Sequence, residues 1–335
     1  MPLSSLDSSP YVLAADIGGT NSRISVFDVH DDQPRQIAMS RLMTNAAKSF
    51  GHLVQSIDDP DLESSIRKCS IAVVAVPGPV FNGTAQHLPN VEWNVNERDL
   101  QSSLPNLPSH RRFLINDFVP HAIACAAMPR EHCRQIQSGE RIPKGLVAAI
   151  GAGTGIGACA VACAHDGKWL AVPSEFGHHP FPFRGQVERE FEDFLLRKLH
   201  QPSIDANVLV SGGGLALLHT FLTDEDCKPE EVAAKLELDS ATGRIFSTFM
   251  ARVMQSYALA TLPLGGLFVV GGVAAKNPRL IDNDCFRAEF VRSRCHEQLL
   301  RRIPIYLNLN EENGLIGAAY YAKLMLRQEL FPVST

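Results

Sequence analysis

One aspartate near the middle of the chain stands where a carboxylate could act as a base. Asp117 follows Asn116 at the end of a short apolar run, RFLI (112–115), which is typical of a strand. A carboxylate at a strand end can accept the proton of a hydroxyl group that attacks phosphorus, and such a base contributes roughly 10²–10⁴-fold. The alternative is that Asp117 caps the helix that follows, since aspartate is favoured there and Pro120 suits an early helical turn.

A glycine-rich string, DIGGTNSR, begins at Asp16. Gly18 and Gly19 permit positive φ and a close backbone approach, so that successive N–H groups can converge on an anion. Thr20 and Asn21 add short side-chain donors, and the Asp16 carboxylate can hold a hydrated Mg²⁺ beside phosphates. A plain hairpin turn is the alternative, because glycine and asparagine favour turns in any case.

A second glycine-rich string, GAGTGIG, begins at Gly151 after an apolar run at 145–150. Alternate glycines leave the backbone bare around Thr154, which suits a triphosphate laid over a tight turn. The string is not a Walker loop, because the Gly-Lys-Ser/Thr ending is absent. It also fails the Gly-x-Gly-x-x-Gly pattern, since Ile156 stands at the third glycine. It is a weak signal alone and a strong one when paired with the first string.

A third string, Glu175-Phe176-Gly177-His178, places a carboxylate close to an imidazole. A carboxylate accepts hydrogen bonds and an imidazole can donate one, so the two side chains could bind a ligand that carries neighbouring hydroxyl groups. The alternative is that Glu175 and His178 are surface residues with no shared role.

The elements that must hold these groups follow from periodicity. The sequence predicts a hairpin at 11–29 and strands at 69–76, 112–115, 145–150, 158–164 and 267–272. It predicts helices at 185–199, 241–263 and 313–329. A strand, a glycine turn and a second strand occur once in each half, which suggests an internal duplication.

Composition limits the class of protein. The chain has 335 residues, 45% apolar and 20% charged, with a net charge of −5, which favours a two-domain globular protein and argues against binding to nucleic acid or anionic membranes. The eight cysteines form no Cys-x-x-Cys pair, and Cys159 and Cys163 lie in an apolar segment, which favours reduced core thiols over zinc ligands or disulfides. The start lacks signal-peptide features and no apolar run reaches the ~20 residues of a membrane span, so we expect a cytoplasmic protein.

From about Leu13 to Gln328 the chain resembles the bacterial glucokinase family of the hexokinase and actin-like ATPase superfamily. The resemblance rests on LAADIGGTNSR, VAVPGPV, LINDF, GAGTGIG, PSEFGH, VSGGG and VVGGV, in the family's order and spacing. It implies an α/β, two-domain actin-like ATPase (ribonuclease H-like) fold with an interdomain cleft. The expected domains are 1–116 plus 313–335, and 117–312. It also implies ATP-dependent phosphorylation of glucose at the 6-hydroxyl with Mg²⁺, and a homodimer.

The family's site residues carry over by motif. The catalytic base would be Asp117. The residues that contact glucose or a related hexose would be Asn116, Asp117, Glu175, His178 and Asn207. ATP would be bound by Asp16, Gly18, Gly19, Thr20, Asn21, Gly151, Gly153, Thr154, Gly155, Gly213 and Gly272, with Gly212-Gly213-Gly214 and Gly271-Gly272 as turns beside the adenosine.

One departure concerns Asn207, where the family commonly has a glutamate that contacts the sugar. An amide in place of a carboxylate weakens one hydrogen bond from ~1.5–3 to ~0.5–1.5 kcal/mol, so we expect a weaker or broader sugar preference. Two alternatives remain. One is a kinase for another hexose or an N-acetylhexosamine, of the repressor/open-reading-frame/kinase (ROK) family, whose zinc-binding cysteines do not follow His178 here. The other is a non-catalytic sugar-sensing regulator on the same fold.

Overall fold

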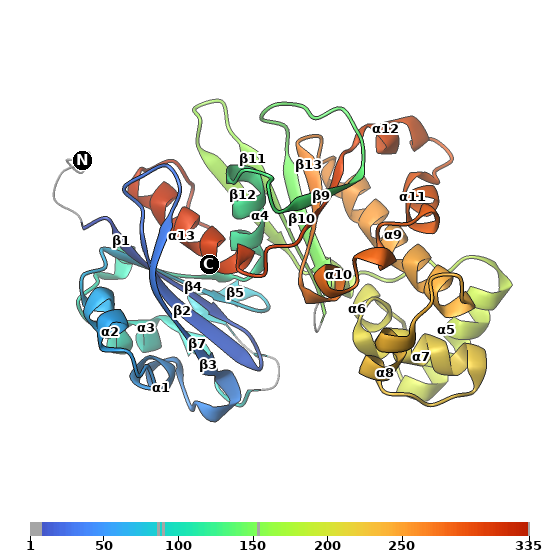
Figure 1. The fold of residues 1–335 in the computed structure, drawn as a ribbon, viewed down its shortest axis with the longest axis horizontal. Helices are drawn as coiled ribbons and strands as arrows, with labels where there is room; N and C mark the ends of the chain where they lie inside the picture. Colours follow the sequence, from blue (N-terminus) through green and yellow to red (C-terminus); the bar gives the residue numbers. More distant parts are fainter. Residues whose placement is uncertain (1–8, 86–87, 89–90, 153–154, 334–335) are drawn as a thin grey trace. The chain divides into compact units, whose positions relative to one another are not determined.

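A computed structural model describes residues 9–85, 88, 91–152 and 155–333. The chain forms two compact units (Figure 1). The first comprises 1–130, 161–173 and 312–335, and the second 131–160 and 174–311. The predicted boundary at 116 differs from this division, because the helix after Asp117 packs against the C-terminal helix of the first unit.

The first unit is built on a five-stranded mixed sheet. In spatial order its strands are β3 (Arg35–Met43), β2 (Asn21–Asp28), β1 (Tyr11–Ile17), β4 (Ile71–Val76) and β8 (Arg112–Asn116). β1 pairs antiparallel with β2, which confirms the hairpin predicted at 11–29. β1, β4 and β8 run parallel to one another. All six residues of β4 are buried, as expected for a strand covered on both faces.

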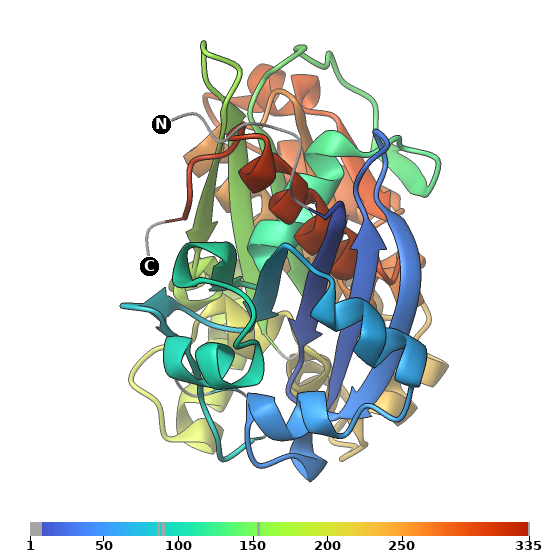
Figure 2. The same ribbon diagram turned by 90° about the vertical axis from the view of Figure 1, so that its left-hand side faces the viewer.

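Helices cover both faces of this sheet. They are α1 (Phe50–Gln55), α2 (Pro60–Arg67), α3 (Glu97–Ser103), α4 (Phe118–Ala127) and α13 (Asn313–Leu326), with 3₁₀ turns η1 (Thr44–Ala46) and η2 (Ser109–Arg111). Figure 2 shows α1 to α3 in front of the sheet and α13, in red, behind it. Leu13, Ala15 and Ile17 of β1 belong to one core cluster with Phe50 and Leu62 of the front helices. Asp16 alternates with them and therefore points to the opposite face.

A small sheet completes the first unit. It consists of β5 (Val80–Phe81), β6 (Thr84–Ala85) and β7 (Val95–Asn96). It follows Pro77-Gly78-Pro79, the segment directly after β4. The strand predicted at 69–76 is confirmed, because β4 ends at Val76.

The second unit contains most of a six-stranded sheet. In spatial order its strands are β12 (Trp169–Ser174), β11 (Ile156–Cys163), β10 (Val147–Ala152), β13 (Gly266–Val270), β14 (Ile305–Asn308) and β9 (Cys133–Gln137). β10, β13 and β14 are parallel and β9 is antiparallel. The strands predicted at 145–150 and 158–164 are confirmed within two residues at each end.

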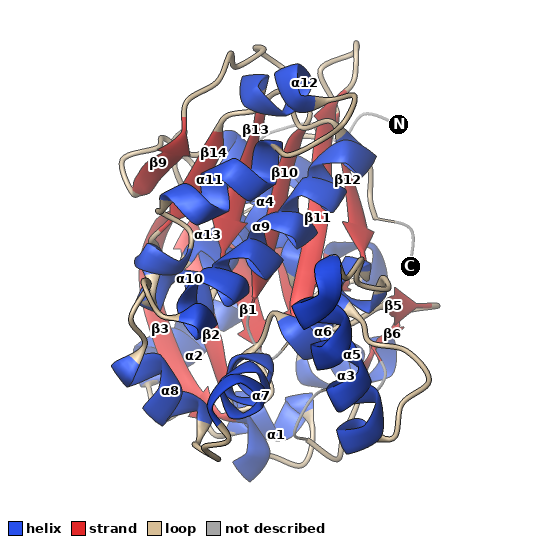
Figure 3. Cartoon of the chain, turned by 90° about the vertical axis from the view of Figure 1, so that its right-hand side faces the viewer, coloured by secondary structure: helices blue, strands red, loops and turns tan. Residues whose placement is uncertain are grey.

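The helices of the second unit pack on this sheet. They are α5 (Gly185–Leu199), α6 (Ala206–Leu209), α7 (Gly212–Thr223), α8 (Pro229–Lys235), α9 (Ala241–Thr261), α10 (Gly272–Lys276), α11 (Asp284–Val291) and α12 (Glu297–Arg302), with 3₁₀ turns η3 (Phe176–His178) and η4 (Pro278–Leu280). Figure 3 shows α9, α10 and α11 in front of the strands.

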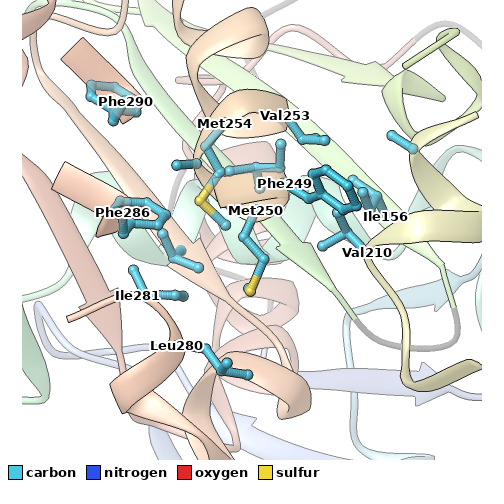
Figure 4. Packing of buried hydrophobic residues seen from close by; sticks show 14 of the residues in the cluster. Ile156, Val210, Phe249, Met250, Val253, Met254, Leu280, Ile281, Phe286 and Phe290 are labelled. Carbon is cyan, nitrogen blue, oxygen red and sulfur yellow. The ribbon is translucent and has the colours of Figure 1, made fainter. Parts of the chain in front are cut away.

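The core of the second unit is centred on α9. Met254 of α9 lies on the side of Phe286 of α11, and Phe249 of α9 lies beside Ile156 and Val210 (Figure 4). The helices predicted at 185–199, 241–263 and 313–329 are confirmed, the last two ending two or three residues early. Among the described residues no helix is both long and apolar enough to cross a bilayer.

The cysteines are all free thiols, as expected. The expectation of core thiols holds for Cys159, which is buried, and is wrong for Cys163, which is half-buried at the end of β11.

Candidate active site

In the first unit, three strand ends bring the predicted polar groups to one edge of the sheet. The register pairs Asp16 of β1 with Ala75 of β4, and Ala75 with Ile115 of β8. Because parallel strands end at the same edge, the 18–21 turn and Asn116-Asp117 both lie at this edge.

Asn116, and not Asp117, satisfies the backbone at the start of α4. The buried Asn116 accepts a hydrogen bond of 2.9 Å at Oδ1 from the Phe118 N–H, and its Nδ2 donates to the Gly78 carbonyl at 3.0 Å. Asp117 anchors its own N–H to the Val76 carbonyl at 2.8 Å, and its side chain makes no capping hydrogen bond. The capping interpretation of Asp117 is therefore wrong.

The 18–21 turn is closed by a backbone hydrogen bond. The Gly18 N–H donates to the Asn21 carbonyl at 3.0 Å, and a Cβ on Gly18 would lie 2.7 Å from that same oxygen. Neither Gly18 nor Gly19 is among the described glycines with positive φ, so close approach and not φ requires the glycine at 18. The side chains of Thr20 and Asn21 are exposed beside the turn.

Asp16 stands next to this turn with Arg23 as its cross-strand partner. Burial raises the pKa of the Asp16 carboxyl, and the Arg23 charge opposes that rise. A hydrated cation would offset the cost of a partly buried carboxylate, so the donor fits Mg²⁺.

His121, which is near Asp117, is not part of any of the motifs singled out in the sequence. His121 lies one helical turn after Asp117 on α4, and its Nδ1 is 2.9 Å from the Asn313 Nδ2 of α13. Burial, with a smaller contribution from Arg23, lowers the pKa of His121 to about 4. His121 is therefore neutral, and only its i, i+4 spacing from Asp117 points to it in the sequence.

In the second unit, the GAGTGIG string begins inside a strand. Gly151 of β10 pairs with Val270 of β13, and a Cβ at 151 would collide with the Val270 carbonyl. The close spacing of β10 and β13 is sufficient to require a glycine at 151. Phosphate binding is not needed to explain this glycine. Gly153 and Thr154 lie outside the described residues.

Of the glycines predicted as turns beside the adenosine, Gly212 to Gly214 and Gly272 lie in the first turns of helices, whereas Gly271 is a bend with φ 92°. Gly212 to Gly214 form the first turn of α7, which Ser211 caps by accepting from the Gly214 N–H at 3.0 Å. A Cβ at Gly214 would collide with the Leu209 carbonyl. Gly213 and Gly272 differ, because the nearest atom to a Cβ at 213 is 3.8 Å away and none lies within 4 Å at 272. Packing does not require those two glycines.

Three side chains gather after β12. His178 Nδ1 lies 3.2 Å from Asp205 Oδ2, and Asn207 Nδ2 lies 3.2 Å from His178 Nε2. His178 N–H donates to the carbonyl of Glu175, whose side chain is exposed. The structure thus groups His178 with Asn207, and adds Asp205, which no predicted role included.

Asn207 is also part of the framework. Its Oδ1 accepts a hydrogen bond of 2.5 Å from the Ile156 N–H and lies against Gly155 and Gly177, where a Cβ on Gly177 would collide with it. One lone pair of the amide oxygen therefore serves the backbone, and the expected direct acceptor role toward a sugar is correspondingly reduced.

A family model described as Glucokinase matches residues 13–325, nearly the whole chain. The chain belongs to the glucokinase family. A glucokinase of Caulobacter sp. is 30% identical, with 95% of this chain and 96% of the relative covered. A glucokinase of Mesorhizobium japonicum is 29% identical over 97% of this chain and 94% of its own.

Solved structures agree on the fold. A glucokinase from an Antarctic psychrotroph has a TM-score of 0.78 at 23% identity, covering 94% of this chain and 99% of its own. A ROK hexokinase from Thermus thermophilus has a TM-score of 0.63 at 19% identity, covering 95% and 99%. The mixed α/β fold of the glucokinase and ROK sugar kinases is therefore confirmed for this chain.

Proposed function

We propose that this chain transfers the γ-phosphoryl group of ATP to the 6-hydroxyl of glucose. The observation that carries the proposal is the placement of Asp117, which follows β8 at the carboxyl end of the parallel strands and makes no capping hydrogen bond to the helix after it. The Asp117 carboxylate is half-buried at this strand end, and a carboxylate can accept the proton of a hydroxyl group bound beside it.

In the proposed reaction, the Asp117 carboxylate accepts the proton of the 6-hydroxyl as that oxygen attacks the γ-phosphorus. The new O–P bond forms while the bond to the β-phosphate breaks and ADP leaves. Asn116 contributes to sugar binding through its second N–H, since the first is held by Gly78.

The phosphates are assigned to the turn of Gly18, Gly19, Thr20 and Asn21, with Mg²⁺ held beside it by Asp16 and supplying charge neutralisation when bound. Gly213 and Gly272 are assigned to the nucleotide, because packing against neighbouring atoms does not require a glycine at either position. Gly155 is also assigned to the nucleotide, although packing gives a second reason for this glycine, because a Cβ would lie 3.1 Å from Asn207 Oδ1.

The sugar's other hydroxyls are assigned to Glu175 and His178, with Asp205 and Asn207 orienting the imidazole. We also propose that the two units correspond to the two domains of the actin-like ATPase fold. Support comes from the parallel strands that end beside the predicted groups in each unit.

A kinase of broader hexose preference is the second candidate. The observation in its favour is that the Asn207 oxygen already accepts from Ile156, so this position offers a sugar mainly an N–H donor. A hydroxyl that is recognised by fewer acceptors is discriminated less strongly.

A coupled assay of ADP release tests both candidates. Glucose, mannose, fructose, glucosamine, N-acetylglucosamine and N-acetylmannosamine are compared, with the glucose product identified by a dehydrogenase specific for glucose 6-phosphate. We expect turnover with glucose, and measurable turnover with its C2 variants if preference is broad. Higher kcat/KM for an N-acetylhexosamine, or no ADP release with any sugar, would refute the proposed function.

A further inference from the structure

Three side chains of different ligand type meet at the C-terminal end of α7. His219 belongs to the last turns of α7, and Glu225 and Cys227 lie in the connection to α8. One ligand atom from each lies within 4.8 Å of the other two, and His219 Nε2 is 3.8 Å from Glu225 Oε2. Among the described residues, this is the one such group of three. None of the three is among the residues assigned to the kinase reaction.

The chain reverses after α7 in a way that brings these side chains together. Asp224 ends the helix in the left-handed region, at φ 59°, with its N–H bonded to the Thr220 carbonyl at 2.9 Å. Thr223 Oγ1 donates to the His219 carbonyl at 2.8 Å and accepts from the Glu225 N–H at 3.2 Å. These contacts place the Glu225 side chain beside the imidazole of His219.

The His219 ring is oriented by a second contact. Its Nδ1 lies 3.4 Å from the hydroxyl of Thr242, which is buried at the start of α9. This leaves Nε2 directed at Glu225. Histidines that bind metals commonly use their other ring nitrogen in this way, which fixes the tautomer and the ring plane.

There is room for an ion beside these groups. A cavity of about 290 Å³ is lined by His219, Glu225 and Cys227 together with Thr242, Glu231 and Lys235. Cys227 is half-buried and the Glu225 side chain is 71% exposed, so both can move. Around a tetrahedral Zn²⁺, with bonds of about 2.0–2.3 Å, ligand atoms lie roughly 3.3–3.6 Å apart. The ligand atoms lie at most 4.8 Å apart, so shifts of roughly 1 Å bring them to that geometry.

We propose that His219, Glu225 and Cys227 bind one Zn²⁺-class ion, with water as the fourth ligand. Thiolate and imidazole prefer zinc or cobalt, whereas Mg²⁺ prefers oxygen ligands in an octahedral arrangement. Binding displaces the proton of the Cys227 thiol, which is released to solvent. The ion ties the end of α7 to the segment leading into α8 and so stabilises the second unit.

Cobalt binding to the full-length chain tests the site directly. The protein is stripped with a chelator and titrated with Co²⁺, without nucleotide or sugar, while thiolate-to-cobalt charge-transfer absorption is followed. We expect saturation at one ion per chain, displacement by Zn²⁺ and not by Mg²⁺, and a higher melting temperature with Zn²⁺. Because no turnover is measured, failure here is separate from failure of the kinase proposal.

Four variants separate this site from adventitious binding. Cys227→Ser should abolish the charge-transfer band, and Glu225→Gln, at an exposed side chain, should weaken binding while the circular dichroism spectrum stays unchanged. Thr242→Val, which removes only the positioning contact, should weaken Zn²⁺ affinity about 10–100-fold. Cys295→Ser is the control, because Cys295 is exposed and lies outside the group.

Retention of the band in Cys227→Ser, its loss in Cys295→Ser, or binding without a fixed stoichiometry would overturn the proposal. Unchanged affinity in folded Glu225→Gln and Thr242→Val would do the same.

Discussion

The Asn207 side-chain oxygen and the Ile156 backbone nitrogen are 2.5 Å apart, and this hydrogen bond joins the start of β11 to α6. The same amide contacts the His178 ring through Nδ2. Asn207 thus fixes the backbone at 156 and the imidazole at once, which gives it a positioning role.

Asn207→Ala should cost stability as well as affinity for sugar. Ile156 is 5% exposed, so its N–H would lose its partner in a buried place at a cost of about 1–3 kcal/mol. Urea unfolding measures that loss, and the glucose KM should rise because Asp205 alone then orients the His178 ring. Gln186→Ala is the control, since its amide bonds Glu190 on an exposed helix face and should change stability by less than about 0.5 kcal/mol. Equal losses in the two variants would contradict the positioning role.

Asp117→Asn should separate turnover from folding. Its kcat should fall about 10²–10⁴-fold while glucose binding persists, because the amide cannot accept the proton. Asp59→Ala is the opposite case, since Asp59 does cap α2 by accepting from Asp61 and Leu62. That variant should lose about 1 kcal/mol of stability with normal kcat. Near-normal turnover of Asp117→Asn would remove Asp117 from the role of base.

Two glycines of the second unit should respond in opposite ways to alanine. Gly272→Ala meets no atom within 4 Å and should leave the melting temperature unchanged. If the nucleotide contacts the backbone at Gly272, the KM of the Gly272→Ala variant for ATP should rise roughly tenfold, which equals about 1.4 kcal/mol. Gly151→Ala forces a Cβ against the Val270 carbonyl and should destabilise the unit by about 1–3 kcal/mol. An unchanged KM for ATP in Gly272→Ala would exclude that position from the nucleotide site.

These cases show why the sequence predicts some features and not others. The hairpin at 11–29 and the helix at 185–199 depend on local periodicity, which the sequence contains in full. The reasons for Gly151 and Gly214 depend on Val270 and Leu209, whose proximity arises only from strand register and helix packing. The same holds for the grouping of His178 with Asp205 and Asn207 across 27 or more residues.

His121 should make stability depend on pH. Its pKa is about 4 in the folded chain, against an ordinary value of 6.5, because burial disfavours the charged form. Below pH 6.5 the unfolded chain takes up a proton that the folded chain excludes, so stability is complete above that pH and is lost as the pH falls toward 4. Between neutral pH and about pH 5 the loss should be roughly 2 kcal/mol.

His121→Gln should remove that contribution, so the free energy of unfolding should vary less over this pH range. His165→Gln, at an exposed turn residue, should retain the full pH dependence. Urea unfolding at several pH values measures both, and parallel curves for the two variants would show that His121 is not the titrating group.

Arg252 should be the most costly charge to remove from the second unit. It is 2% exposed on α9 and donates to Glu188 of α5 at 2.6 and 3.0 Å and to Glu289 of α11 at 2.8 Å. Arg252→Met removes the cation that pairs with Glu188, whereas Glu289 keeps Arg184 at 2.9 Å. Removing one partner of a buried pair costs about 3–5 kcal/mol. Arg301→Met provides the comparison, because Arg301 pairs with Glu297 on an exposed surface where such pairs contribute about 0.2–1 kcal/mol. Adding Glu188→Gln to Arg252→Met should recover part of the loss, since the carboxylate that lost its cation is then neutral. A difference of less than about 1 kcal/mol between the two arginine variants in urea unfolding would show that Glu188 does not depend on Arg252.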